Sequence, residues 1–156
     1  MEELGVPVAF LLSQAEHRMA RRLEPLLAAH DCSLERWRVL CGLASHGPQR
    51  GHPMSDVATF ATLPAPSATK LIDGMVADNL VYRRVDVHDR RRVLIFPTPH
   101  GRALHRRLSL AIEEQQQQLV ERVSPDGGDG LAVLLGRLIA HLDAEQDPGR
   151  VQARCK

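Results

Sequence analysis

Two prolines one residue apart, Pro64 and Pro66, set the first limit on how this chain can fold. Neither can lie inside a helix, because the proline ring lacks a backbone N–H and clashes with the preceding turn. The periodic apolar segment before them is predicted to be a short helix, capped by Ser55 and ending near Ala61. Pro66 suits the first position of a following helix, predicted to end at about Asn79. The sequence therefore places a tight turn between two helices.

The helix that begins at Pro66 is predicted to have one packing face and one polar face. Because a helix advances by about 100° per residue, its apolar side chains share one side. These are Ala68, Leu71, Ile72 and Met75. The other side, with Ser67 at its edge, carries Pro66, Thr69, Lys70 and Asp73. One side is built to pack, and the other is open to a partner.

One later segment is predicted to form β structure. Around residues 80–98, β-branched and aromatic residues flank a polar turn at 88–90, which is typical of a β-hairpin. Eight arginines but only two acids, Asp86 and Asp89, fall between Arg83 and Arg107, although the formal net charge of the whole chain is only +1. The basic charge is therefore concentrated in and just after the hairpin.

The ends of the chain are predicted to be long amphipathic helices. Apolar residues recur at helical spacing over 8–27, 104–123 and 131–142. A further helix is predicted to begin after Ser33, which caps it, and a loop or a short extended connection is expected over 46–53.

These long helices have more apolar surface than one small module can cover, so a second copy of the chain is the expected partner. The alternative is that the apolar stripes pack within one subunit. The residues expected at the dimer interface are Val8, Leu11, Leu12, Leu131, Leu134, Leu135, Leu138 and Leu142.

The length of 156 residues predicts one folding unit over 1–147, followed by a flexible tail at 148–156. Dimerisation helices are expected at about 6–30 and 101–146, on either side of a central module at about 33–100. With 44% hydrophobic residues but only five aromatic ones, the core should be mainly aliphatic and helical.

A helix with an open polar face, followed by an arginine-tipped hairpin, fits duplex DNA. The helix can enter the major groove, while hairpin arginines neutralise phosphates or enter the minor groove. Asp89 is expected to orient Arg91. The alternative is a helical domain with a merely solvated hairpin. The residues predicted to contact DNA are Pro66, Ser67, Thr69, Lys70, Asp73, Arg84, Asp89, Arg90, Arg91 and Arg92.

In these two segments the sequence resembles the MarR family of winged helix-turn-helix regulators, over about residues 8–142. The recognition-helix motif corresponds to Thr69, Ile72, Asp73 and Met75. The wing motif corresponds to Asp89, Arg90, Arg91, Thr98 and Gly101. There are two departures from the family pattern. Pro97 stands where leucine is usual, and the 46–53 connection is longer than usual.

The resemblance implies a mainly α (α+β) fold, with one β-hairpin wing between long N- and C-terminal dimerisation helices. It also implies a homodimer that binds a pseudo-palindromic operator in double-stranded DNA. Such regulators are more often repressors than activators, and a small-molecule effector is expected to release them. Alternative functions are a metal- or thiol-based sensor and a helical protein-interaction module.

Several single residues have two interpretations. Trp37 is expected to pack against the first helix and, with His17, is a candidate for an effector pocket. Cys32 precedes a helix, where a thiolate is stabilised, so it is a redox candidate as well as a candidate buried residue. The eight histidines raise the possibility of zinc, but His17 and His105 lack a second ligand four residues on.

No catalytic motif occurs, so we expect neither an enzyme nor a resident metal or cofactor. The three cysteines form no CxxC pair. Two glutamates precede the first apolar run, where a signal peptide needs basic residues, and no run is long enough to span a membrane. We therefore expect a cytoplasmic protein.

Overall fold

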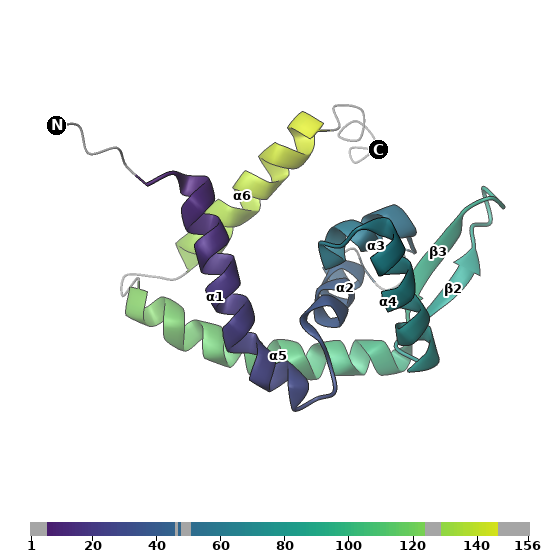
Figure 1. Ribbon diagram of the computed structural model, residues 1–156, viewed down its shortest axis with the longest axis horizontal. Helices are drawn as coiled ribbons and strands as arrows, with labels where there is room; N and C mark the ends of the chain where they lie inside the picture. Colours follow the sequence, from purple (N-terminus) through teal and green to yellow (C-terminus); the bar gives the residue numbers. More distant parts are fainter. Residues whose placement is uncertain (1–5, 46, 48–50, 124–128, 147–156) are drawn as a thin grey trace. The chain divides into compact units, whose positions relative to one another are not determined.

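The computed structural model describes residues 6–45, 47, 51–123 and 129–146, and it divides into two compact units, Met1–Ile112 and Glu113–Lys156. The expected 148–156 tail lies outside the described residues. The expectation of one folding unit stays a prediction. In chain order (Figure 1) the elements are α1 (Val8–Ala28), α2 (Leu34–Ser45), β1 (His52–Pro53), α3 (Met54–Ala61), α4 (Ala65–Ala77), β2 (Val81–Val85), β3 (Val93–Pro97), α5 (Pro99–Val123) and α6 (Asp129–Gln146).

The core of the first unit is aliphatic, as composition predicts. Helix α3 packs between α2 and α4, and α2 also contacts α1 and β3. Gly42 allows the closest of these approaches, because a Cβ there would lie only 2.2 Å from Cγ of Phe60. The largest fully buried side chains include Leu27, Leu40, Leu43, Ile72, Met75 and Leu108. The packing face predicted for α4 is confirmed, since Ala68, Ile72 and Met75 are each 0% exposed.

The sheet has three strands in the order β1-β3-β2, so the expectation of a single hairpin as the only β structure is wrong. The third strand comes from the end of the predicted loop, where His52 pairs with Ile95 and Pro53 with Leu94. A residue before proline favours extended backbone. An edge strand tolerates the missing N–H of Pro53. The hairpin itself is confirmed, with Val81 opposite Pro97 and Val85 opposite Val93.

Two predicted helix starts move toward the N-terminus, that of α3 by two positions and that of α4 by one. Helix α3 begins at Met54 with Pro53 as its N-cap, so the cap predicted at Ser55 is wrong. The Ser55 hydroxyl instead donates to Asp56 Oδ1 at 3.4 Å. Helix α4 begins at Ala65, which makes Pro66 its second residue. A proline is tolerated there too, because the first N–H groups of a helix have no intrahelical acceptor.

The end of α4 is closed by a Schellman motif. Asn79 takes the left-handed conformation with φ 54°. Its N–H donates to the Val76 carbonyl, and the Leu80 N–H donates to the Met75 carbonyl at 2.9 Å. These bonds satisfy carbonyls that the last turn would otherwise leave open. They also turn the chain directly into β2.

Thr98 joins this turn to the start of α5. Its buried hydroxyl donates to the Asn79 carbonyl at 2.6 Å and accepts from the Gly101 N–H at 2.9 Å. The second bond is an N-cap of α5. Gly101 is required because a Cβ there would lie 2.0 Å from the Leu80 carbonyl oxygen. The Thr-x-x-Gly spacing thus holds the end of α4, the start of β2 and the start of α5 together.

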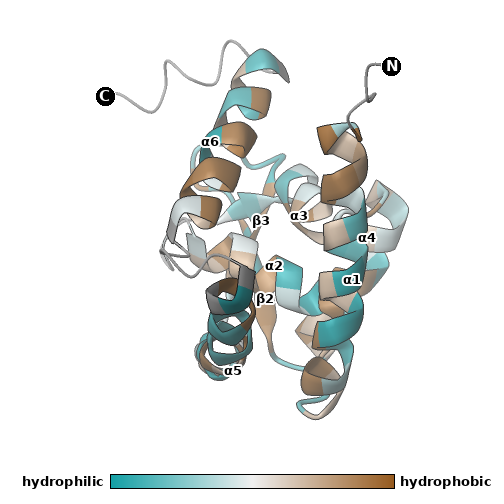
Figure 2. Ribbon diagram, turned by 90° about the vertical axis from the view of Figure 1, so that its left-hand side faces the viewer, coloured by the Kyte–Doolittle hydropathy of each residue, from teal (hydrophilic) through white to brown (hydrophobic). Residues whose placement is uncertain are grey.

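The second unit contains the last turns of α5 and helix α6. The described leucines of α6 are mostly exposed, with Leu134 at 63% and Leu131 at 51%. Figure 2 shows hydrophobic residues on α6 and at the N-terminal end of α1. None of the helices in the described part of the chain is long and apolar enough to cross a membrane.

Gly101→Ala should destabilise the protein, because the added Cβ collides with backbone rather than with a flexible side chain. We expect a loss of about 1–3 kcal/mol in the free energy of unfolding, measured by urea denaturation at one protomer concentration. Gly136→Ala in α6 is the matched control. A Cβ there meets nothing within 4 Å, so alanine should be neutral or stabilising by up to about 1 kcal/mol. Equal behaviour of the two variants would contradict the proposed joint.

Candidate nucleic-acid interface

The turn between α3 and α4 sets the entry of the second helix. Thr62 adopts a left-handed conformation with φ 57°, although it is β-branched. The Leu63 N–H then donates to the Ala58 carbonyl at 3.0 Å, which closes α3. Pro64 accepts the Ala68 N–H and starts α4. This turn holds a β-branched residue in a conformation that costs about 1–2 kcal/mol.

The first turns of α4 present the residues that the sequence predicted. All of Pro66, Ser67, Thr69 and Lys70 are exposed. The Thr69 hydroxyl donates to the Ala65 carbonyl at 3.0 Å, which constrains its rotamer. No ion pair of Lys70 occurs within the described residues, so its ammonium group remains available to a ligand.

Asp73 already forms an ion pair within the protein. Its Oδ1 accepts a 2.6 Å charge-assisted bond from Nη2 of Arg83 on β2. The pair joins α4 to the hairpin and neutralises a carboxylate that would otherwise repel phosphate. Asp73 therefore links α4 to the hairpin, and its contact with DNA stays a prediction. Sequence analysis missed Arg83 as its partner.

A second ion pair holds the other end of α4. Nη2 of Arg36 on α2 lies 2.7 Å from Asp78 Oδ2, just past the helix end. The same nitrogen would lie 3.3 Å from a Cβ at Gly74. A cation at a helix C-terminus is favourable because of the helix dipole. Sequence patterns did not reveal this contact, because its partners are far apart in the chain.

The tip of the hairpin is held by backbone capping from two aspartates. Asp86 Oδ1 accepts the His88 N–H at 2.9 Å, and Asp89 Oδ1 accepts the Arg91 N–H at 3.0 Å. Asp89 thus orients Arg91 through its backbone N–H. Arg90, Arg91 and Arg92 are exposed, and none has an ion pair within the described residues. The tip therefore carries three exposed arginine side chains on a loop that these two hydrogen bonds hold in shape.

The base of the hairpin positions Arg84 by stacking. Its guanidinium carbon lies 4.3 Å from the ring centroid of Phe96. Tyr82, opposite Phe96 in the sheet, stacks on the same ring with 5.3 Å between centroids. A cation–π contact of this kind restrains the guanidinium but leaves its N–H donors open. The stacked ring therefore holds the guanidinium of Arg84 in place at the base of the hairpin.

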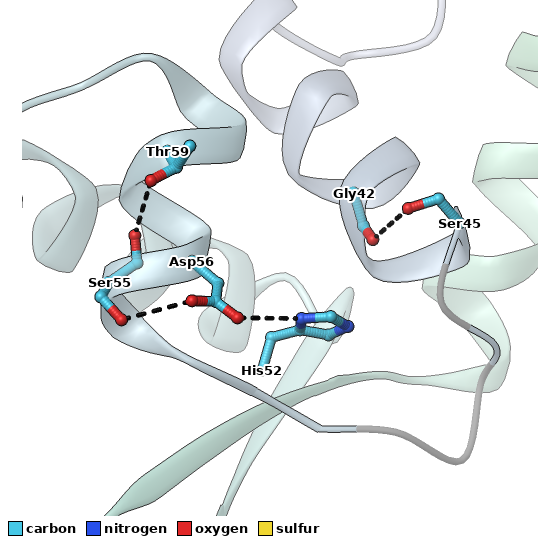
Figure 3. A network of polar contacts seen from close by, with 6 residues as sticks. All are labelled: Gly42, Ser45, His52, Ser55, Asp56 and Thr59. Carbon is cyan, nitrogen blue, oxygen red and sulfur yellow. Dashed lines mark hydrogen bonds and ion pairs between the residues drawn. The ribbon is translucent and has the colours of Figure 1, made fainter. Parts of the chain in front are cut away.

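A polar network fixes β1 against the start of α3 (Figure 3). His52 is 3% exposed, and its Nδ1 lies 3.5 Å from Asp56 Oδ2. Its ring also meets Phe60 edge-on at 5.2 Å. Thr59 donates to the Ser55 carbonyl one turn away. These contacts attach the third strand to the helical module.

The two candidate effector residues lie on different helices and differ in exposure. His17 on α1 is exposed. Trp37 packs against the aliphatic core, which agrees with the packing interpretation. Its indole Nε1 is nevertheless buried without a hydrogen-bond partner among the described residues. A buried donor of this kind is suited to an incoming acceptor.

Cys32 does not have the environment that the redox hypothesis needs. It is 5% exposed, and burial raises the pKa of its thiol to about 11, although nearby Arg36 acts in the opposite direction. Burial likewise raises the pKa of the Cys41 thiol to about 11. At neutral pH both are thiols, so the interpretation of Cys32 as a buried structural residue is preferred. In the described ranges, no three histidine, cysteine or acidic side chains form a possible metal site.

Comparison with known proteins agrees with this geometry. A family model described as MarR family matches residues 30–92. The homoprotocatechuate degradative operon repressor of Escherichia coli is 29% identical over 136 residues, which cover 87% of this chain and 90% of that protein. Over residues 30–92 the chain is therefore similar to the MarR family.

Solved structures with this MarR fold superpose on nearly the whole chain. NadR in complex with 4-hydroxyphenylacetate has a TM-score of 0.76 at 24% identity, over 91% of this chain and 96% of its own. Staphylococcus aureus MepR in its DNA-binding conformation has a TM-score of 0.70 at 25% identity, over 88% and 99%. The MarR match at 30–92 ends at Arg92, so it includes α4 and the hairpin tip.

The buried thiols should be almost unreactive in the folded protein. In a Cys155→Ser variant, which keeps Cys32 and Cys41, we expect a disulfide reagent at pH 7.5 to react about a hundredfold or more slowly than with an ordinary thiol. The rate should rise about tenfold per pH unit until the pH approaches the raised pKa. The urea-denatured variant, in which both thiols should react at the ordinary rate, is the control. Fast native reaction at Cys32 would restore the redox hypothesis.

Proposed function

We propose that this chain is an effector-responsive repressor that binds a pseudo-palindromic operator in double-stranded DNA as a homodimer, in the cytoplasm and without a catalytic step. The observation that carries the proposal is the pairing of an open first turn of α4 with a basic hairpin tip. Lys70 and Thr69 can reach base edges in the major groove, while Arg90 and Arg92 reach phosphates.

The two sets of contacts have different energetic roles. Phosphate neutralisation supplies affinity that falls with salt and does not depend on sequence. Base-edge contacts supply discrimination, since a lysine can donate to guanine N7 and O6 and a threonine can meet a thymine methyl group. The Arg83–Asp73 pair supports both, because it links the base-contacting helix to the strand that leads to the tip.

A homodimer is supported by the apolar surface that each unit leaves open. Val8 and Leu11 on α1 are 67% and 53% exposed, and Leu142 on α6 is 45% exposed. Leu12 and Leu138 are also classed as exposed, and Leu135 is half-buried. Large apolar side chains in such numbers on helix faces are typical of protein interfaces.

A small-molecule effector is supported by two observations. The curated E. coli relative is named a repressor of a degradative operon, and NadR was solved with a small carboxylate. In this chain, the unpartnered Nε1 of Trp37 offers a buried donor to such a ligand. His17 remains a candidate from α1.

Two substitutions should separate the part of DNA affinity that is the same for all duplexes from the part that depends on the base sequence. Arg90→Gln should weaken binding to all duplexes alike and reduce the slope of log affinity against log salt by about 1. Lys70→Ala should instead cost about 1–3 kcal/mol at particular base pairs and change the consensus selected from randomised duplexes. Arg107→Gln, on the exposed side of α5, is the control and should change neither. An Arg90→Gln slope equal to wild type would refute the wing contact, and an unchanged consensus would reduce Lys70 to a phosphate contact.

Light scattering should give a mass near twice the 17.3 kDa of one chain. Leu134→Glu should shift the protein toward monomer, since the charge would be buried in the interface. Ala132→Glu is the matched control, because residue 132 is also exposed but lies about 200° around α6 from Leu134. A wild-type protein that stays monomeric at micromolar concentration would refute the dimer.

A further inference from the structure

Arg36 attaches the C-terminal end of α4 to the start of α2. Its Nη2 lies 2.7 Å from Asp78 Oδ2, just past the last turn of α4. The backbone of Arg36 is itself held, because its N–H donates to the hydroxyl of Ser33 at 3.3 Å, as in a helix N-cap. Helix α2 is anchored in the core by Val39 and Leu40, which are almost completely buried. The guanidinium therefore reaches α4 from a fixed backbone.

Gly74 makes room for this contact. A Cβ at Gly74 would lie 3.3 Å from the same Nη2 of Arg36, which is closer than an ordinary van der Waals contact. Gly74 and Asp78 are one turn apart, so the guanidinium lies along one side of the end of α4. A glycine inside a helix is less favourable than alanine. Here the missing side chain lets the guanidinium approach the helix.

Helix α4 is thus held by ion pairs on two sides. Asp73 accepts a bond from Arg83 of the hairpin, whereas Arg36 lies beside Gly74, about 100° further around the helix. The buried apolar face adds attraction without direction, so the two ion pairs add a directional restraint on rotation of α4 about its own axis. A rotation of about 20° would move a side-chain tip at a radius of about 5 Å by about 2 Å. Such a displacement is larger than a functional contact tolerates.

We propose that Arg36 is a positioning residue for DNA recognition, which holds α4 so that Thr69 and Lys70 in its first turns meet base edges. The inference rests on the proposed function. Arg36 acts at the opposite end of α4 and is itself given no contact with DNA. An exposed ion pair contributes little to stability. Loss of the Arg36–Asp78 pair should therefore change the selectivity of DNA binding more than the free energy of unfolding.

Affinity should be measured for the duplex that wild type selects from a randomised pool and for an unrelated duplex of the same length. Arg36→Gln should weaken binding to the selected duplex about tenfold, because Thr69 and Lys70 lose their alignment with the base edges. Binding to the unrelated duplex and the slope of log affinity against log salt should stay as in wild type, since Arg36 contacts no phosphate. Arg36→Lys, which keeps the charge, should recover part of the loss.

Arg38→Gln is the matched control. Arg38 lies on the same helix and forms an ion pair with Glu16 on α1, and the side chains of Arg36 and Arg38 are each 25% exposed. The substitution removes the same charge from α2, but the ion pair that it breaks does not involve α4. Both duplex affinities should therefore equal those of wild type.

Gly74→Ala tests the geometry without removing a charge. Alanine favours the helix, so the urea midpoint should not fall. The added Cβ should nevertheless displace the guanidinium of Arg36 and weaken binding to the selected duplex about threefold. In an Arg36→Gln background the same substitution should have no further effect on affinity. If Arg36 served stability alone, affinity would instead follow the urea midpoint.

A second measurement needs no DNA. The N–H groups of Asn79 and Leu80 close the end of α4. Their hydrogen exchange should be faster in Arg36→Gln than in wild type and unchanged in Arg38→Gln. Equal exchange in Arg36→Gln and wild type would show that Arg36 does not hold α4 and would overturn the proposal.

Three results with DNA would also overturn it. One is wild-type affinity of Arg36→Gln for the selected duplex. Another is an equal loss on both duplexes with a lower salt slope, which would make Arg36 a phosphate contact. The third is an effect of Gly74→Ala that persists without Arg36, because the added methyl group would then act on DNA directly. If wild type selects no duplex, the proposed function fails, whereas the exchange measurement decides separately whether Arg36 holds α4.

Discussion

The hydroxyl of Thr98 is the contact on which the arrangement of the interface depends. It joins the carbonyl of Asn79, where α4 ends, to the Gly101 N–H in the first turn of α5. The joint works only because Asn79 turns the chain through a left-handed conformation and because Gly101 has no side chain. A buried hydroxyl with both roles satisfied is costly to replace, since removing it would leave backbone groups unpaired. Helix α4, the hairpin and the start of α5 are therefore oriented from one point.

Acidic residues hold the basic hairpin in position. Asp86 and Asp89 satisfy backbone N–H groups of the hairpin tip, and Asp73 holds Arg83 between helix and strand. The arginines of the tip therefore lie on a loop whose backbone N–H groups have acceptors within the loop. Exposed ion pairs contribute little to stability, so the value of the Asp73–Arg83 pair lies in orientation.

Much of the fold could be predicted from local pattern. The extents of α1 and α2, the packing face of α4 and the hairpin all followed from periodicity and turn residues. The wrong predictions concern positions whose local structure depends on contacts with segments that are distant in the sequence. β1 exists because β3 offers an edge to His52 and Pro53, and Ser55 lost its predicted role because Pro53 already starts α3. The redox hypothesis for Cys32 is disfavoured for a similar reason. Proximity to a helix start favours a thiolate, but burial by the core outweighs it.

By itself the sequence determined the order of the elements, the identity of the exposed residues on α4 and the position of the basic tip, because these depend on neighbours within a few residues. Only the tertiary structure decided which of the charged side chains already form ion pairs or hydrogen bonds within the protein. The pairing of Asp73 with Arg83, the contact of Arg36 with Asp78 and the meeting of Arg102 with Pro97 join positions that no short-range pattern relates. The physical reason is that a side chain's partner depends on chain folding in space, whereas its helical or strand geometry depends mainly on local backbone preference.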